Sequence, residues 1–298
     1  MSIRYFERVI VGLALAPVDR DLLQYARMLN DLGQGKTRFT FIHALPAETR
    51  AKIPSVTAVS EARSAVRAVV ADVFGPADGH EMRVMNENLV DALLGEAADG
   101  GADLILVGHR RNSRGRRSLS RRLAIKAPCS VWMVPEGSPA RISRVVTAVD
   151  MSQPSALALS FGTLVANRAG LDQCTVLHVL TPSIIGYEKE ERAVVTSAMT
   201  EFLAPVDVHG VNVKIRLEES GSVAGAVKAL TEDGHDLVVI GTRGRSPSAA
   251  VLLGSESEHV LTESPVPVLI TKLPGERIGV LKALLERDFK FQYKPHFG

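Results

Sequence analysis

Hydrophobic residues in this chain gather in short continuous runs that alternate with longer segments of mixed polarity. The runs are rich in Val, Ile and Leu and show little polar alternation, which is typical of strands covered on both faces. The longer segments have the length and composition of helices. Regular alternation of strand and helix predicts an α/β fold with a doubly wound, mainly parallel, Rossmann-like sheet.

Each half of the chain shows the same succession of elements. In the first half, strands are expected at 8–15, 38–44, 81–85, 104–108 and 131–134, and helices near 20–32, 55–73, 88–99 and 120–126. In the second half, strands are expected at 144–150, 173–179, 211–217, 237–241 and 266–271, and helices near 154–168, 188–203, 221–233 and 255–263. The pattern therefore predicts two five-stranded units.

The sequence itself repeats at the same interval. Residues 102–108 (Ala-Asp-Leu-Ile-Leu-Val-Gly) match residues 235–241 (His-Asp-Leu-Val-Val-Ile-Gly). Self-similarity at a fixed interval indicates a duplicated structural unit. We therefore expect two homologous domains, residues 1–138 (copy one) and residues 142–273 (copy two), followed by a C-terminal tail at 274–298.

Composition limits the classes of protein that this chain can belong to. With 298 residues, 46% hydrophobic and 23% charged, it has the length for two domains and ample material for a core. Two cysteines, Cys129 and Cys174, cannot form a disulfide framework or a four-ligand zinc site, so reduced, partly buried thiols are expected. The apolar run at 9–17 is too short for a membrane span, which needs about 20 residues. We expect a cytoplasmic protein.

One segment carries an excess of positive charge. Residues 108–128 contain eight Arg or Lys and no acid, whereas the whole chain has a formal charge of only +2. Arginine suits bidentate binding of phosphate or carboxylate, so this segment is a candidate site for an anionic ligand or partner. Its candidate residues are Arg110, Arg111, Arg114, Arg116 and Arg117. A solvated charge run is the simpler alternative, and nucleic acid is disfavoured because no aromatic residues interleave.

A glycine pattern in copy two is the strongest candidate for a ligand site. Gly241 and Gly244 follow an expected strand, and after nine intervening residues Gly254 and Ser255 open an expected helix. Doubly wound sheets bind ligands beyond the carboxyl ends of their strands. Glycines let backbone N–H groups approach a phosphate, and a helix start adds unpaired N–H groups and a favourable dipole. The alternative is that the glycines form turns and that residues 255–258 form a capping box.

With these residues the sequence resembles the universal stress protein family, in a tandem two-domain form. The resemblance rests on the glycine pattern, on the strand Val-Val-Thr-Ala-Val-Asp at 145–150, on His178-Val179 and on Ser-Pro-Val-Pro-Val-Leu-Ile at 264–270. It implies binding of ATP, with Mg²⁺ as an accompanying ion. The implied site residues are Ala148, Val149, Asp150, Val179, Gly241, Arg243, Gly244, Gly254, Ser255, Glu256 and Ser257. Met151 departs from the family, which often has glycine there, and it could narrow the mouth of the site.

Copy one departs much further from the family pattern. Ala14 stands where copy two has Asp150, and Arg111 replaces the second glycine. Copy one is therefore expected to be a degenerate partner that does not hold ATP. His43 and His178 end matching strands, and a structural hydrogen bond is favoured over catalysis for both.

The expected function is nucleotide-dependent regulation in a stress response. No lysine stands in the glycine loop and no carboxylate pair is evident, so the protein is at most a slow ATPase. An adaptor that uses the Arg-rich segment without nucleotide is the alternative. The resemblance implies that the last strands of the two copies pair within one chain, and a homodimer of such chains is also considered. Aromatic residues in the tail favour docking over a frayed end; they are Phe289, Phe291, Tyr293 and Phe297.

Overall fold

The computed structural model describes residues 3–50, 56–76, 79–109, 116–180, 189–242 and 254–272. Copy one contains β1 (Arg8–Leu13), α1 (Val18–Leu32), β2 (Arg38–Ala44), α2 (Ala47–Arg50), α3 (Val56–Phe74), β3 (Glu81–Met85), α4 (Leu89–Gly100), β4 (Leu104–His109), α5 (Arg116–Lys126) and β5 (Ser130–Pro135). Copy two contains β6 (Val145–Ala148), α6 (Gln153–Arg168), β7 (Gln173–Leu180), α7 (Lys189–Leu203), β8 (Asn212–Glu219), α8 (Val223–Glu232), β9 (Leu237–Gly241), α9 (Ser255–Glu263) and β10 (Val268–Thr271). The tail 274–298 lies outside the described residues.

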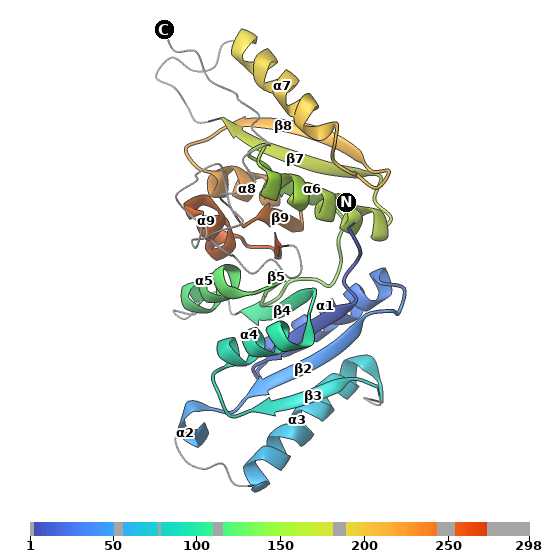
Figure 1. Ribbon diagram of the computed structural model, residues 1–298, viewed down its shortest axis with the longest axis vertical. Helices are drawn as coiled ribbons and strands as arrows, with labels where there is room; N and C mark the ends of the chain where they lie inside the picture. Colours follow the sequence, from blue (N-terminus) through green and yellow to red (C-terminus); the bar gives the residue numbers. More distant parts are fainter. Residues whose placement is uncertain are drawn as a thin grey trace.

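These strands form one continuous sheet with the order β3-β2-β1-β4-β5-β10-β9-β6-β7-β8 (Figure 1). All neighbouring strands are parallel except β5 and β10, which are antiparallel where the two copies meet. The order is the same in both copies when each is followed from its outer edge to this junction. The doubly wound α/β fold predicted from the strand and helix alternation is confirmed.

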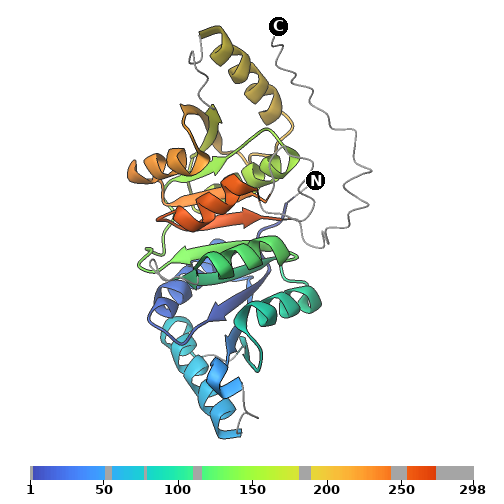
Figure 2. The same ribbon diagram turned by 90° about the vertical axis from the view of Figure 1, so that its left-hand side faces the viewer.

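Helices cover both faces of the sheet and bury its apolar strands (Figure 2). One core cluster joins α1, α3 and α6 to one face, and a second joins α4, α5, α8 and α9 to the other. Both clusters contain residues of both copies. On the first face, the ring of Phe6 stacks on that of Phe161, with centroids 5.4 Å apart, and Trp132 packs edge-on against Phe6. The two copies therefore share their hydrophobic cores.

A buried lysine closes the junction between the copies. Lys272 directly follows β10, and its Nζ donates to the carbonyl oxygens of Ile125 (3.2 Å) and Ala127 (2.8 Å), at the end of α5. The hydroxyl of Ser130 accepts from the N–H of Lys272 (3.0 Å) and donates to its carbonyl (3.1 Å). An ammonium group is stabilised at the negative end of a helix, so this residue ties copy two to copy one.

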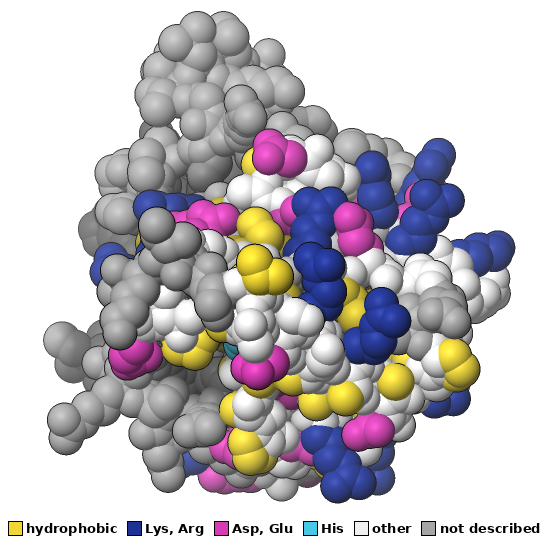
Figure 3. Space-filling model, turned by 90° about the horizontal axis from the view of Figure 1, so that it is seen from below, with side chains coloured by type: hydrophobic (Ala, Val, Ile, Leu, Met, Phe, Trp, Pro, Cys, Tyr) yellow, Lys and Arg dark blue, Asp and Glu magenta, His cyan; other side chains and the backbone are white. Residues whose placement is uncertain are grey.

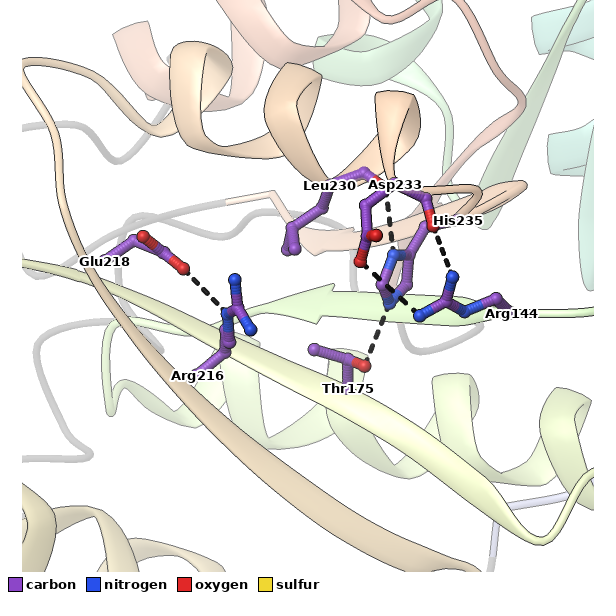
Figure 4. Close-up of polar contacts among 7 residues, drawn as sticks. All are labelled: Arg144, Thr175, Arg216, Glu218, Leu230, Asp233 and His235. Carbon is purple, nitrogen blue, oxygen red and sulfur yellow. Dashed lines mark hydrogen bonds and ion pairs between the residues drawn. The ribbon is translucent and has the colours of Figure 1, made fainter.

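A buried histidine lies at the amino ends of the strands of copy two, on the side of the sheet opposite the carboxyl ends. His235 is 3% exposed; its Nδ1 lies 2.9 Å from the carbonyl of Leu230, and its Nε2 lies 2.9 Å from Oγ1 of Thr175 (Figure 4). Because a carbonyl only accepts, Nδ1 carries the proton and Nε2 accepts from the hydroxyl. Burial lowers the pKa of His235, and nearby Arg144 lowers it further, although the bond to Leu230 and two acids, Asp233 and Asp236, oppose this.

Acid should therefore destabilise copy two at the amino ends of its strands. The unfolded chain binds a proton at His235 near pH 6.5, whereas the folded chain binds it only at lower pH, so the free energy of unfolding falls as pH drops through that window. Each unit of pKa difference is equivalent to about 1.4 kcal/mol. Urea denaturation at pH 7.5 and pH 5.5 should show that the free energy of unfolding falls less in His235→Ala than in wild type. This variant installs the residue that copy one has at the matching position, Ala102.

His80 also makes stability depend on pH, but it is present in both wild type and His235→Ala. Burial also lowers its pKa, so it contributes a pH dependence of the same sign to both proteins, and only the difference between them reports on His235. Equal loss of stability in wild type and variant would contradict the assignment.

Candidate functional site

The carboxyl ends of β6, β7 and β9 bring the expected site residues of copy two to one edge of the sheet. Ala148 pairs in register with Ile240 on β9 and with Leu177 on β7, so Asp150, Val179 and the end of β9 follow on the same edge. The start of α9 meets this edge, because Ser257 Oγ donates to the carbonyl of Gly241 (3.2 Å). Arg243 and Gly244 lie outside the described residues.

The loop between β6 and α6 holds Asp150 in a defined orientation. Its Oδ1 accepts from the N–H of Ser152 (3.1 Å) and from the Ser152 hydroxyl. Ser155 Oγ accepts from the same N–H (3.1 Å) and lies 3.4 Å from the N–H of Asp150. Ser152 and Ser155 also form the capping box of α6. These bonds fix the carboxylate before any ligand is present, which lowers the ordering cost of binding.

Met151 adopts the left-handed backbone conformation, with φ = +61°. Glycine takes this conformation without steric cost, which gives a physical reason for the glycine that the family resemblance leads us to expect here. The Met151 side chain is partly buried and packs against an apolar cluster that includes Val149, Leu159 and Met199. In copy one, Leu15 has φ = +52° at the matching position, so the bend is a property of the loop in both copies.

Two histidines connect strand ends in the same way in each copy. His178 Nδ1 lies 2.8 Å from the carbonyl of Val149, and His43 Nδ1 lies 3.0 Å from the carbonyl of Leu13. In both, the ring donates to a carbonyl just beyond or at the end of the neighbouring strand. The expected structural hydrogen bonds are confirmed.

Gly241 has a packing role that the glycine pattern alone does not reveal. A Cβ at this position would lie 2.8 Å from the carbonyl oxygen of Pro154 and 2.9 Å from its carbonyl carbon, in the first turn of α6. Gly108 plays the matching part in copy one, where a Cβ would lie 3.0 Å from Val18. Close approach of helix to strand therefore explains the first glycine in both copies, whether or not a phosphate binds.

The start of α9 differs from the capping box that the sequence suggested as an alternative. Gly254, not Ser255, is the N-cap residue, and no side-chain cap hydrogen bond is present. The capping-box alternative for residues 255–258 is therefore wrong. Glycine has no side chain that could satisfy the first N–H groups of the helix, and such groups attract anions.

The two acids in the first turn of α9 are bound to neighbouring helices. Glu256 accepts from the N–H of Val223 at the start of α8 (2.8 Å), and Glu258 pairs with Arg121 on α5 (3.3 Å). Each carboxylate has a donor of its own, which reduces its repulsion toward an anion at the helix start. Arg121 belongs to copy one, so copy one contacts the helix that would hold phosphate in copy two.

Copy one supplies a carboxylate of its own to the loop between β1 and α1. Asp19, 3% exposed, accepts from the N–H groups of Ala14 (3.1 Å) and Ala16 (3.2 Å). In copy two, the hydroxyl of Ser155 serves the matching groups. Burial raises the pKa of Asp19, although these hydrogen bonds oppose the shift. Asp19 was not expected from the sequence, in which only the absence of the acid at Ala14 was apparent, although an alignment of the two copies could have found it.

The Arg-rich segment is described only in part. Arg110, Arg111 and Arg114 lie outside the described residues, and Arg116 and Arg117 begin α5 with undescribed side chains. Two further arginines of this helix are paired: Arg121 with Glu258, and Arg122 with Asp91 at 2.7 Å. Viewed from the end formed by copy one, Lys and Arg side chains lie among acidic and hydrophobic ones (Figure 3). Exposed arginines also occur on α1 and α3, at Arg20, Arg27, Arg63 and Arg67.

Other chemistries find little support in the part of the chain that the structure describes. Among those residues there is no group of three or more His, Cys, Asp or Glu that could hold a metal ion. Within the same residues, no helix is both long enough and apolar enough to cross a membrane. Cys129 and Cys174 are fully buried, and burial raises the pKa of each thiol to about 12. Both cysteines are therefore unreactive in the folded protein.

Comparison with known proteins supports the duplicated architecture. The universal stress protein family model matches residues 6–135 and again residues 141–272. A universal stress protein from Archaeoglobus fulgidus DSM 4304 is 20% identical, with a TM-score of 0.63 over 90% of this chain and 97% of that one. A functionally unknown protein from Pseudomonas aeruginosa PAO1 is 17% identical, with a TM-score of 0.63 over 94% and 96%. No curated protein sequence matches significantly.

A structure of a universal stress protein from Archaeoglobus fulgidus in complex with dAMP matches 43% of this chain and 97% of its own, at 20% identity and a TM-score of 0.36. The two longer structural matches show the fold. The family model covers nearly all of both copies, and the chain therefore belongs to the universal stress protein family.

Proposed function

We propose that copy two binds an adenine nucleotide, ATP being the expected form, and that the protein regulates a stress response through nucleotide-dependent conformation or partner binding. The observation that carries the proposal is the start of α9, which has no side-chain cap and adjoins the end of β9 and the Asp150 loop. N–H groups at a helix start suit a phosphate. The proposal places the protein in the cytoplasm, as a tandem chain or a dimer of such chains.

The family resemblance distributes the roles along the site. Asp150 would accept from the ribose or adenine end, Val179 would pack on the base, and the backbone of Ala148 and Val149 would line the cleft. The phosphates would lie against Gly241, Arg243, Gly244, Gly254, Ser255, Glu256 and Ser257. Bound Mg²⁺ would neutralise phosphate charge. The loop 241–254 contains no lysine, so this chain binds the nucleotide and hydrolyses it slowly at most.

Removal of the Asp150 carboxylate should weaken ATP binding about tenfold. Loss of one hydrogen bond to a charged group costs about 1.5–3 kcal/mol, and the lower end of this range is about a factor of ten in Kd. Isothermal titration calorimetry of the full chain with ATP and MgCl₂ would compare wild type with Asp150→Ala. Asp172→Ala is the matched control, because it removes an exposed acid at the opposite edge of the sheet.

The same titration reports how many sites the chain has. One nucleotide per chain is expected, because copy one has Ala14 in place of the acid and supplies Asp19 to its own loop. Two sites of similar affinity would contradict the division between the copies. Failure of wild type to bind any adenine nucleotide would overturn the proposal itself.

A further inference from the structure

We propose that Arg121 of copy one is a positioning residue for the nucleotide site of copy two and acts through Glu258 in the first turn of α9. Nε of Arg121 lies 3.3 Å from Oε2 of Glu258, so an ion pair crosses the junction between the copies. Helices α5 and α9 lie side by side on the same face of the sheet, within one core cluster (Figures 1 and 2). The inference rests on the proposed function, because it concerns the helix start that would hold the phosphates.

Glu258 would hinder an anion at this helix start if its charge were left unpaired. Its N–H donates to the carbonyl of the N-cap residue Gly254 (2.9 Å), so it lies one turn into α9. A carboxylate so close to the start of a helix repels a phosphate bound there. The other acid of this turn, Glu256, accepts from the N–H of Val223 within copy two (2.8 Å). Glu258 instead depends on an arginine of copy one.

The two partners of the ion pair occupy corresponding positions in the two copies. Arg121 lies seven residues before Pro128, in the stretch Ala-Pro-Cys-Ser-Val of copy one. Glu258 lies seven residues before Pro265, in the matching stretch Ser-Pro-Val-Pro-Val of copy two. This correspondence follows from the sequence repeat and is independent of the contact between the two side chains.

The strands at the junction show the same correspondence. Trp132 and Leu269 each lie four residues after the matching proline, and they pair directly in the antiparallel contact of β5 with β10. Corresponding residues of the two copies therefore face one another across a local twofold axis. If both copies carried the same charged residue on these helices, like charges would meet and repel. Arginine in one copy and glutamate in the other convert this contact into an attraction.

Arg122, the next residue of α5, provides a matched control. It pairs with Asp91 on α4 at 2.7 Å, so its ion pair lies within copy one. The two arginines are similarly exposed, with 53% of the Arg121 side chain and 39% of the Arg122 side chain accessible to solvent. Replacement of either by Gln removes one positive charge from the same helix. A difference between the two variants therefore reports on Glu258 rather than on net charge.

Calorimetric titration of the full chain with ATP and MgCl₂, at low and at high ionic strength, tests the inference. Arg121→Gln should weaken ATP binding about threefold at low ionic strength, since an exposed ion pair typically changes an equilibrium by less than about fivefold. The loss should shrink at high ionic strength, because salt screens exposed charges. Glu258→Gln and the double variant Arg121→Gln/Glu258→Gln should both bind ATP at least as tightly as wild type, because the unpaired carboxylate is gone. Arg122→Gln should match wild type, and thermal unfolding checks that each variant folds.

The possible failures of this experiment are distinguishable. Absence of ATP binding in wild type overturns the proposed function and the inference with it. Binding by wild type that Arg121→Gln leaves unchanged overturns the inference alone. Equal weakening by Arg121→Gln and Arg122→Gln would mean a general effect of charge, and weakening that persists in the double variant would mean that Arg121 acts on the nucleotide without Glu258. Either of these results also overturns the inference.

Discussion

Replacement of Lys272 by Met should lower the free energy of unfolding by about 2–3 kcal/mol. The ammonium group donates to two carbonyls at the end of α5, and a hydrogen bond from a charged group contributes about 1.5–3 kcal/mol. Burial of the charge opposes this gain, so the two bonds are not fully additive. Thermal unfolding followed by the fluorescence of Trp132, the single tryptophan, should show a midpoint lower by roughly 5 °C.

Two further variants show whether the loss of stability comes from the contacts of Lys272 at the junction or from removal of a positive charge alone. Lys126→Met removes an exposed lysine at the end of α5 and should change stability by less than about 0.5 kcal/mol. Ser130→Ala removes the hydroxyl that bonds to the backbone of Lys272 and should cost about 1–2 kcal/mol. If Lys272→Met behaves like Lys126→Met, the buried ammonium does not hold the copies together.

Alanine at two helical glycines should have opposite effects. Gly162 lies inside α6, where a Cβ would collide with Oγ1 of the fully buried Thr147 on β6. Overpacking of this kind costs about 1–3 kcal/mol, and we expect Gly162→Ala to destabilise by about 2 kcal/mol. Gly95 lies inside α4, and a Cβ there meets no atom within 4 Å, so Gly95→Ala should stabilise by roughly 0.5–1 kcal/mol.

The comparison is informative because both changes bring the same gain in helix propensity. Urea denaturation of the two variants, with equal slopes, would give the difference directly. A stabilising Gly162→Ala would mean that α6 can move away from β6. Such freedom would also weaken the case that Gly241 is required by the approach of Pro154.

Strand and helix placement was predictable because the apolar runs are fully buried and therefore nearly continuous. The exact residues at which the strands end were harder to predict. Strands were expected to reach residues 15 and 150, whereas β1 ends at Leu13 and β6 at Ala148. The loops that follow need a left-handed residue at Leu15 and Met151, which neither residue type signals. The four-residue helix α2 was also missed, since it is too short to show a period.

Site chemistry that depends on distant contacts was harder to predict. Lys272 is an ordinary charged residue in the sequence, and only the antiparallel junction buries it against α5. Asp19 gave no signal on its own, because its role follows from two N–H groups in the preceding loop. Gly254 was correctly expected at the helix start, and only the capping-box alternative placed the cap one residue late, at Ser255.

The antiparallel junction of β5 and β10 has a consequence for how the two halves could diverge. In a symmetric pair of identical chains, every substitution occurs twice, so a change that spoils one ligand site spoils both. A covalent tandem removes this constraint, since each half has its own codons while the partner remains attached. Ala14 and Asp19 in one half can therefore differ from Asp150 and Ser155 in the other without the difference being copied to both sites.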